Sequence, residues 1–213
     1  MTREELKKYL LAFRLNVSNS LKTKTSIEYF ECSGIQIPRY INEYWTSKQR
    51  QNNPIHEISY RACYKPELPR FFISLFTKEN DTVYDPFSGR GTTAIEAALL
   101  KRKIIANDIN PLSRILSKPR LFIPSTSDVE ERLKKLKFKS GLKADIDLSM
   151  FYHPETESEI VSLRNYLIMR KKNKKEDFID DWIRMVATNR LTGHSKNFFS
   201  VYTLPPNQAV IQE

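Results

Sequence analysis

The chain has 213 residues, enough for one domain with its own core and an appended lobe. Lysine and arginine outnumber aspartate and glutamate by ten, which favours a polyanionic partner without saying which kind. No apolar run is long enough to span a bilayer, and the charged N-terminus does not resemble a signal peptide. Cys32 and Cys63 stand far apart without metal-type spacing, so we expect reduced, buried thiols in a cytoplasmic protein and no metal site.

The first quarter of the chain is expected to contain one helix, one short strand and an irregular arm. Apolar residues at helical spacing predict a helix over 3–15, and a β-type run predicts a strand over 27–30. Residues 37–54 are predicted to be irregular, and they interleave basic with aromatic side chains. That mixture suits contacts with phosphates and stacking on bases, and it equally suits an arm whose aromatics pack on the core. The DNA-contact candidates of this arm are Arg39, Tyr40, Trp45, Lys48 and Arg50.

The middle of the chain predicts a strand, a helix and a second strand, in that order. β-type residues cover 82–84 and 103–107, and a helical run covers 94–100. Another helix is expected to start at Pro66, before the first of these strands. Together these segments predict a βαβ unit.

A glycine-containing turn joins the first of these strands to its helix. It begins at Asp85 and contains Gly89 and Gly91, two of the five glycines in the chain. Glycine has no Cβ, so the backbone of such a turn can approach a ligand closely. Asp108 follows the second strand, where a βαβ unit places an acid that holds ribose hydroxyls. The spacing therefore predicts a site for a nucleotide-type cofactor.

The C-terminal half is predicted to be mainly helical, with one further strand. The expected elements are a short helix at 111–117, a strand at 120–123, a helix from a capping box at 127–130 to about 136, an irregular stretch to Met150, and two long helices at 154–171 and 176–191.

Two polar segments of this half fit either a structural or a functional role. The basic run 170–175 indicates either a solvated turn or phosphate contacts. Residues 188–200 are typical either of a glycine-terminated helix end or of a loop that faces DNA, which adds His194 to the DNA-contact candidates. Among the other histidines, His153 is expected to precede or cap its helix, and His56 stands near the presumed cofactor helix.

The glycine turn and its flanks resemble the cofactor loop of S-adenosylmethionine-dependent DNA amino-methyltransferases, which act on adenine N6 or cytosine N4 in restriction-modification systems. The matching stretches are Asp85-Pro86-Phe87-Ser88-Gly89-Arg90-Gly91-Thr92-Thr93, Ala97-Ala98, Asn107-Asp108-Ile109-Asn110-Pro111 and, upstream, Tyr64-Lys65-Pro66-Glu67-Leu68. The resemblance implies an α/β fold with a Rossmann-like class I methyltransferase sheet, S-adenosylmethionine as cofactor and double-stranded DNA as partner.

The resemblance also implies a role for each matching residue. Asp85 would lie near the methionine end of the cofactor, Asp108 would hold the ribose, and Ile109 would lie against the adenine. The full set of predicted cofactor-binding residues is Lys65, Asp85, Pro86, Phe87, Ser88, Gly89, Gly91, Thr92, Thr93, Asp108 and Ile109.

One part of the family pattern is absent from the 213 residues. Family members place Asp, Asn or Ser before Pro-Pro and an aromatic, so that the acceptor binds the target amine and the aromatic stacks on the flipped base. The string Leu204-Pro205-Pro206-Asn207 has neither the acceptor nor the aromatic. The sheet is also short of strands. We therefore expect an incomplete sheet without catalytic residues, with the catalytic half supplied after Glu213 or by a second polypeptide.

The expected organisation is an N-terminal arm over 1–54, a cofactor-binding core over 55–136 and a helical lobe over 137–213. Two other functions stay open. Some RNA methyltransferases also carry this type of loop followed by Ile95-Glu96-Ala97-Ala98, and a non-catalytic cofactor- or DNA-binding subunit would need the same loop.

Overall fold

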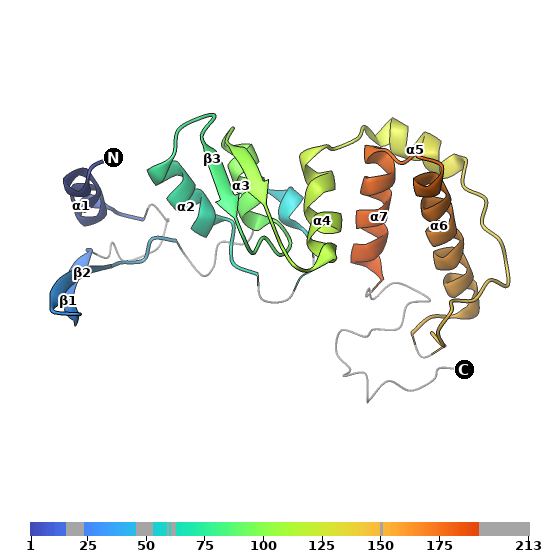
Figure 1. The fold of residues 1–213 in the computed structure, drawn as a ribbon, viewed down its shortest axis with the longest axis horizontal. Coiled ribbons are helices and arrows are strands. Elements are labelled where there is room, and N and C mark those ends of the chain that lie inside the picture. The colour runs from blue at the N-terminus through green and yellow to red at the C-terminus, as the bar shows by residue number, and fades with distance from the viewer. Residues whose placement is uncertain (16–23, 46–52, 59, 61–62, 150, 192–213) are drawn as a thin grey trace. The chain divides into compact units, whose positions relative to one another are not determined.

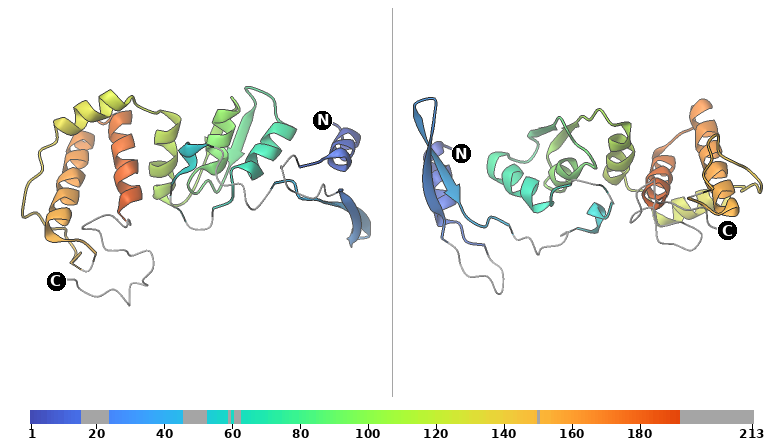
Figure 2. Two further views of the ribbon diagram at one scale, coloured as in Figure 1. Left: turned by 180° about the vertical axis from the view of Figure 1, so that it is seen from behind. Right: turned by 90° about the horizontal axis from the view of Figure 1, so that it is seen from below.

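The computed structural model describes residues 1–15, 24–45, 53–58, 60, 63–149 and 151–191. They form a mixed α/β protein with two short two-stranded sheets and several helices (Figures 1 and 2). Its contacts define two compact units. The first contains Met1–Glu57, Ala62–Asp85 and Thr92–Ala106, and the second contains Ile58–Arg61, Pro86–Gly91 and Asn107–Glu213. The predicted division after residues 54 and 136 stays a prediction.

The first unit begins with a helix and an antiparallel hairpin. Helix α1 spans Arg3–Ala12 and has a capping box in which the Thr2 side chain accepts the Glu5 N–H. Strand β1, Ser26–Cys32, pairs with β2, Ile35–Ile41. The prediction of an irregular segment from residue 37 is therefore wrong over the length of β2.

A two-residue turn explains the hairpin, and its signal was present in the sequence. Ser33 and Gly34 both have positive φ, at 51° and 77°, as the tight turn of a hairpin requires. Pro38 lies within β2, although proline donates no ladder hydrogen bond. The sheet has only two strands, so β2 is an edge strand, where proline is tolerated.

The predicted βαβ unit is confirmed in the same part of the chain. Strand β3, Thr82–Asp85, pairs in parallel with β4, Lys103–Ala106, and helix α3, Thr92–Leu99, connects them. Helix α2, Glu67–Phe76, starts after Pro66 as expected and packs on α3. This arrangement places the ends of two parallel strands next to each other, with Asp85 opposite Ala106.

Aromatic rings of the N-terminal arm pack on α2. The Phe71 ring lies 5.3 Å from the Tyr44 ring and 6.0 Å from the Trp45 ring, measured between centroids. Phe13 of the segment after α1 meets Phe71 edge-on at 5.7 Å. Ring pairs at such distances add to the stability gained from burying their area. Tyr44 and Trp45 thus contribute to packing within the first unit.

The second unit is helical among its described residues. Its elements are α4 (Pro111–Ser117), the 3₁₀ turn η2 (Lys118–Leu121), α5 (Thr126–Lys134), α6 (Pro154–Lys172) and α7 (Phe178–Arg190). Its core brings Ile58, Leu116 and Met185 together, with Trp182 packed against them. The two long helices were predicted with bounds close to these.

Two details of the second unit differ from prediction. The strand expected at 120–123 is wrong, because η2 occupies its start and the buried Arg120 guanidinium donates to the Leu116 carbonyl of the preceding helix. The cap of α5 is Ser125, whose hydroxyl accepts the Asp128 N–H, and not Ser127. In both places a side chain forms a hydrogen bond with a backbone group three or four residues away, which the sequence pattern did not indicate.

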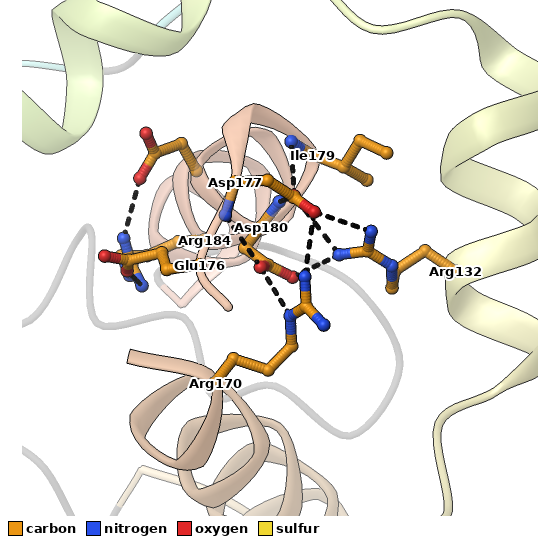
Figure 3. A network of polar contacts seen from close by, with 8 residues as sticks. Arg132, Arg170, Glu176, Asp177, Ile179, Asp180 and Arg184 are labelled. Carbon is orange, nitrogen blue, oxygen red and sulfur yellow. Dashed lines mark hydrogen bonds and ion pairs between the residues drawn. The ribbon is translucent and has the colours of Figure 1, made fainter. Parts of the chain in front are cut away.

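Ion pairs join α5, α6 and α7 (Figure 3). Asp180 of α7 is fully buried, and its carboxylate binds Arg132 of α5 and Arg170 of α6, each at 2.6 Å. Asp177 caps α7 and binds the same two arginines at 2.8 Å. Burial acts to raise the pKa of the Asp177 carboxyl, but hydrogen bonds from Arg132 and the Asp180 N–H, together with the charges of Arg132 and Arg170, lower it overall. Arg170, the first residue of the basic run 170–175, therefore has a structural role.

Two further predictions concern cysteines and membrane spans. Cys32 and Cys63 are both free thiols, as expected, and both are exposed, so the prediction that they are buried is wrong. Cys32 ends β1 of a hairpin whose side chains on both faces are largely open to solvent. Within the described part of the chain, no helix has the length and apolar character to cross a bilayer.

A buried carboxylate connects three segments of the first unit. Glu96 of α3 is 1% exposed, and its two oxygens lie 2.7 Å from His56 Nε2 and 2.7 Å from Arg70 Nε. His56 ends the 3₁₀ turn η1, Pro54–His56, and is itself fully buried. Because this buried carboxylate binds a histidine of η1 and an arginine of α2, it holds η1, α2 and α3 together.

We expect Glu96→Ala to lower the free energy of unfolding by about 3–5 kcal/mol, because it leaves a buried ring N–H and a guanidinium without their acceptor. Denaturant unfolding followed by circular dichroism measures the loss. The matched control is Glu79→Ala, since Glu79 forms an exposed pair with Lys101 and such pairs contribute at most about 1 kcal/mol. Equal losses in the two variants would contradict the structural role of Glu96.

Candidate functional site

The turns that follow β3 and β4 are hydrogen-bonded to each other. The Ser88 N–H donates to the Asn107 carbonyl at 2.9 Å, and the Gly89 N–H donates to Asp108 Oδ2 at 2.7 Å. The Ser88 hydroxyl is buried, donates to the same Asn107 carbonyl at 3.1 Å and lies 2.9 Å from the Ser113 hydroxyl. The glycine turn and the acid predicted from sequence are therefore brought together, over an interval of 19 residues.

Asp108 is an acceptor held in place by backbone groups. Oδ1 accepts the Asn110 N–H at 2.8 Å, and Oδ2 accepts the Gly89 N–H. These two bonds, with that of Asn110 the larger cause, lower the pKa of the Asp108 carboxyl, so the carboxylate is charged at neutral pH. A carboxylate has about four lone-pair sites, so two remain for a ligand's hydroxyl groups.

The two glycines of the turn are needed for different reasons. Gly89 has φ +49°, and a Cβ there would meet the Tyr60 ring only at ordinary contact distance, 3.5 Å. Gly91 has φ +84°, and a Cβ there would lie 2.5 Å from Ser117 Cβ. The close approach at Gly91 is therefore made by helix α4 of the protein itself, and not by a ligand.

The residue between the glycines is buried in the second unit. Arg90 is 6% exposed and donates from Nη1 to the Ile58 carbonyl at 2.8 Å, while its own carbonyl accepts from Arg120. Burial lowers the pKa of Arg120 to about 10, and the nearby Arg90 charge adds to the effect. Sequence reasoning assigned no role to Arg90, because an arginine between two glycines gives no sign of which way it points.

Two apolar side chains beside the turn are unusually open. Ile109 is fully exposed, and Phe87 is 84% exposed. Large apolar side chains with this exposure lose the stabilisation that burial brings, so they favour an apolar ligand or partner. Exposed apolar groups, a fixed carboxylate and a turn with backbone at positive φ together fit a nucleoside with its base and ribose.

The first unit contributes a second small group of predicted residues. Asp85 is the last residue of β3, and Thr92 and Thr93 begin α3. The Tyr64 hydroxyl forms a hydrogen bond with the Thr93 hydroxyl. Burial raises the pKa of the Tyr64 phenol, the bond to Thr93 opposes the rise, and the charge of Asp85 adds to it. Tyr64, which begins the matching stretch over 64–68, is therefore a neighbour of Asp85 and Thr93.

The remaining predicted cofactor residues lie in or beside these groups. Pro86 accepts a bond from the Asn107 side-chain amide through its carbonyl at 3.4 Å. Lys65 is half-buried, one residue before the N-cap of α2. Of the eleven predicted residues, four belong to the first unit (Lys65, Asp85, Thr92 and Thr93) and seven to the second (Pro86, Phe87, Ser88, Gly89, Gly91, Asp108 and Ile109).

The described residues that were predicted to contact DNA differ in their surroundings. Arg39 of β2 is exposed and forms an ion pair with Glu28 of β1, while Tyr40 is half-buried opposite Ile27. Trp45 packs on α2. Lys48, Arg50 and His194 lie outside the described residues, as does the segment Leu204–Asn207.

The histidines and acids of the described residues do not gather into a metal-binding group. His56 is paired with Glu96, and His153 is the N-cap of α6 without a side-chain capping bond. His153 therefore precedes its helix without capping it through the ring.

A glycine turn after one parallel strand and an acid after the next are typical of α/β proteins that hold a nucleotide-type cofactor at the strand ends. Comparison with known proteins is more specific. The DNA methylase family acting at N6 or N4 matches residues 8–116, just over half of the chain. The chain belongs to this family.

Three curated relatives are methyltransferases of type II systems. The chain is 29% identical to the Type II methyltransferase M.MvaI of Kocuria varians over 71% of its own length and 37% of the relative's. It is 29% identical to M.BsoBI of Geobacillus stearothermophilus, covering 51% of the chain and 26% of the relative. It is 33% identical to M.MjaI of Methanocaldococcus jannaschii, covering 48% of the chain and 34% of the relative. The chain thus spans between about a quarter and two fifths of these proteins, and no solved structure matches it.

We expect Gly91→Ala to destabilise the protein more than Gly141→Ala does. Both glycines have positive φ, +84° and +74°, so each alanine carries backbone strain of about 1–2 kcal/mol. Only the Cβ at position 91 meets another residue within 4 Å, which adds about 1–3 kcal/mol of overpacking. Denaturant unfolding of both variants measures the difference. Equal losses would show that α4 does not pack on the turn as described.

Proposed function

We propose that this chain is the S-adenosylmethionine-binding part of a site-specific DNA amino-methyltransferase of a restriction-modification system. The enzyme would transfer a methyl group to adenine N6 or cytosine N4 of double-stranded DNA. The observation that carries the proposal is the pair of bonds from Ser88 and Gly89 to Asn107 and Asp108. They fix a carboxylate beside a glycine turn in a chain of the DNA methylase family.

The proposed cofactor contacts follow from the chemistry of the groups. Asp108 would accept hydrogen bonds from the ribose hydroxyls with its remaining lone pairs. Ile109 and Phe87 would cover the adenine, which would remove their exposed apolar area from water. Asp85 and Lys65 would serve the methionine end, and the backbone of 86–91 would line the site. A Rossmann-like class I sheet, of which β3 and β4 form two strands, is part of this proposal.

The catalytic step would require residues that this chain does not supply. The 213 residues contain no Asp, Asn or Ser followed by Pro-Pro and an aromatic. The chain covers at most 37% of the relatives' lengths, which leaves room for such a loop in the rest of a longer protein or in a second polypeptide. In this proposal the chain binds the cofactor and part of the DNA, and the other part completes the sheet and binds the flipped base.

The alternative of an RNA methyltransferase has less support. The matching family is described as a DNA methylase, and all three relatives are named Type II methyltransferases. A non-catalytic subunit remains compatible with the same site, because it would bind the cofactor through the same turn.

We expect Asp108→Ala to weaken S-adenosylmethionine binding by roughly tenfold or more, because it removes charge-assisted hydrogen bonds to the ribose. Titration calorimetry measures the affinity. Asp108→Asn tests the charge separately, since it keeps one oxygen that can accept the Gly89 N–H.

Asp147→Ala is the matched control for this experiment. Asp147 is an exposed carboxylate that, like Asp108, has a lowered pKa. Its Oδ1 accepts the Ser149 N–H two residues on, just as Asp108 Oδ1 accepts the Asn110 N–H. Its removal should leave cofactor affinity unchanged. Unchanged affinity in Asp108→Ala would remove Asp108 from the site, and absence of binding by the unaltered chain would remove the cofactor site altogether.

A further inference from the structure

A lysine-rich segment begins at the end of α5 and forms the first part of the connection from α5 to α6 in the second unit. Residues 134–143 contain five lysines and no acid: Lys134, Lys135, Lys137, Lys139 and Lys143. All five are exposed. After the end of α5 the segment has no helix or strand, and Figures 1 and 2 draw it as the yellow trace that runs beside α6. We call residues 134–143 the lysine strip.

Buried side chains of α6 hold the backbone of the strip and of the residue that follows it. The Ser162 hydroxyl accepts the Lys139 N–H at 3.0 Å, and the Ser158 hydroxyl accepts the Leu142 N–H at 2.9 Å. Ser158 also donates to the Lys139 carbonyl at 2.7 Å, and the Glu157 carboxylate accepts the Ala144 N–H at 2.8 Å. Ser158, Ser162 and Glu157 are all buried. The irregular backbone is therefore held by buried side chains of α6.

Two lysines of the strip have an acid nearby. Lys135 pairs with Glu131 of α5, and the charge of Lys143 helps to lower the pKa of the Asp147 carboxyl. Among the described residues, no acid lies within ion-pair distance of Lys134, Lys137, Lys139 or Lys143. A fixed segment with four such cations within ten residues repels itself, and a polyanion relieves that repulsion.

We propose that the lysine strip binds backbone phosphates of double-stranded DNA. Lysine is a flexible point charge suited to phosphate oxygens, and such contacts position a protein on the duplex without reading its sequence. The proposal rests on the proposed function for the identity of the polyanion, and it adds a binding surface in the helical lobe, separate from the arm over 37–54.

The test replaces Lys137, Lys139 and Lys143 by glutamine and measures binding of a fluorescent 20-base-pair duplex by anisotropy over a range of salt concentrations. Each phosphate contact contributes about 0.9 to the slope of log affinity against log salt, so the slope should fall by about 2–3. Affinity near 0.1 M salt should fall about 10- to 100-fold. S-adenosylmethionine affinity and the melting temperature should stay unchanged, because the three side chains are exposed.

The matched control replaces Lys7, Lys8 and Lys78, three exposed lysines of the first unit, by glutamine and so removes the same charge. Its slope should fall by less than 1. If the slope falls equally in the two triple variants, or stays unchanged in the strip variant, the lysine strip does not bind the phosphates; the proposed DNA substrate would still stand. If the unaltered chain binds no duplex, both the strip proposal and the proposed DNA substrate are wrong. Preferential loss of binding to a structured RNA of the same length would reassign the strip to RNA.

Discussion

The proposed cofactor site depends on the hydrogen bonds between two turns that are 19 residues apart in the chain. Ser88 and Gly89 donate to the Asn107 carbonyl and to Asp108, so the glycine turn cannot move without the acid. The parallel pairing of β3 with β4 makes this possible, because it places the carboxyl ends of both strands at the same edge. The exposed Ile109 and Phe87 then border a carboxylate of fixed position, which is what a nucleoside requires.

Buried acids play a recurring part in holding segments of this chain together. Glu96 connects η1, α2 and α3 in the first unit, and Asp180 connects α5, α6 and α7 in the second (Figure 3). Glu157 holds the segment that follows the lysine strip. Such contacts also specify geometry, since a buried charge tolerates few alternative partners.

Membership of the DNA methylase family gives these local features a common purpose. A methyltransferase must hold its methyl donor, bind the nucleic acid and present the target amine to the sulfonium. The described residues offer candidates for the first two tasks, in the glycine turn and in the lysine strip. The third depends on a tetrapeptide that these 213 residues do not contain. Relatives two and a half to four times as long as the matched part have the length for all three tasks.

The sequence by itself determined the βαβ unit, the turn between Asp85 and Thr92, the acid at 108 and the two long helices, because each has a local signature in periodicity, glycine or capping residues. The sequence interpretation missed the hairpin strand β2, which follows the turn at Ser33 and Gly34, and the 3₁₀ turn at Arg120. Only the tertiary structure decided that Ser117 approaches Gly91 closely, that Arg90 turns inward and that Ser158 holds the lysine strip. Those contacts join residues far apart in the chain, and their direction depends on packing, which no local pattern encodes.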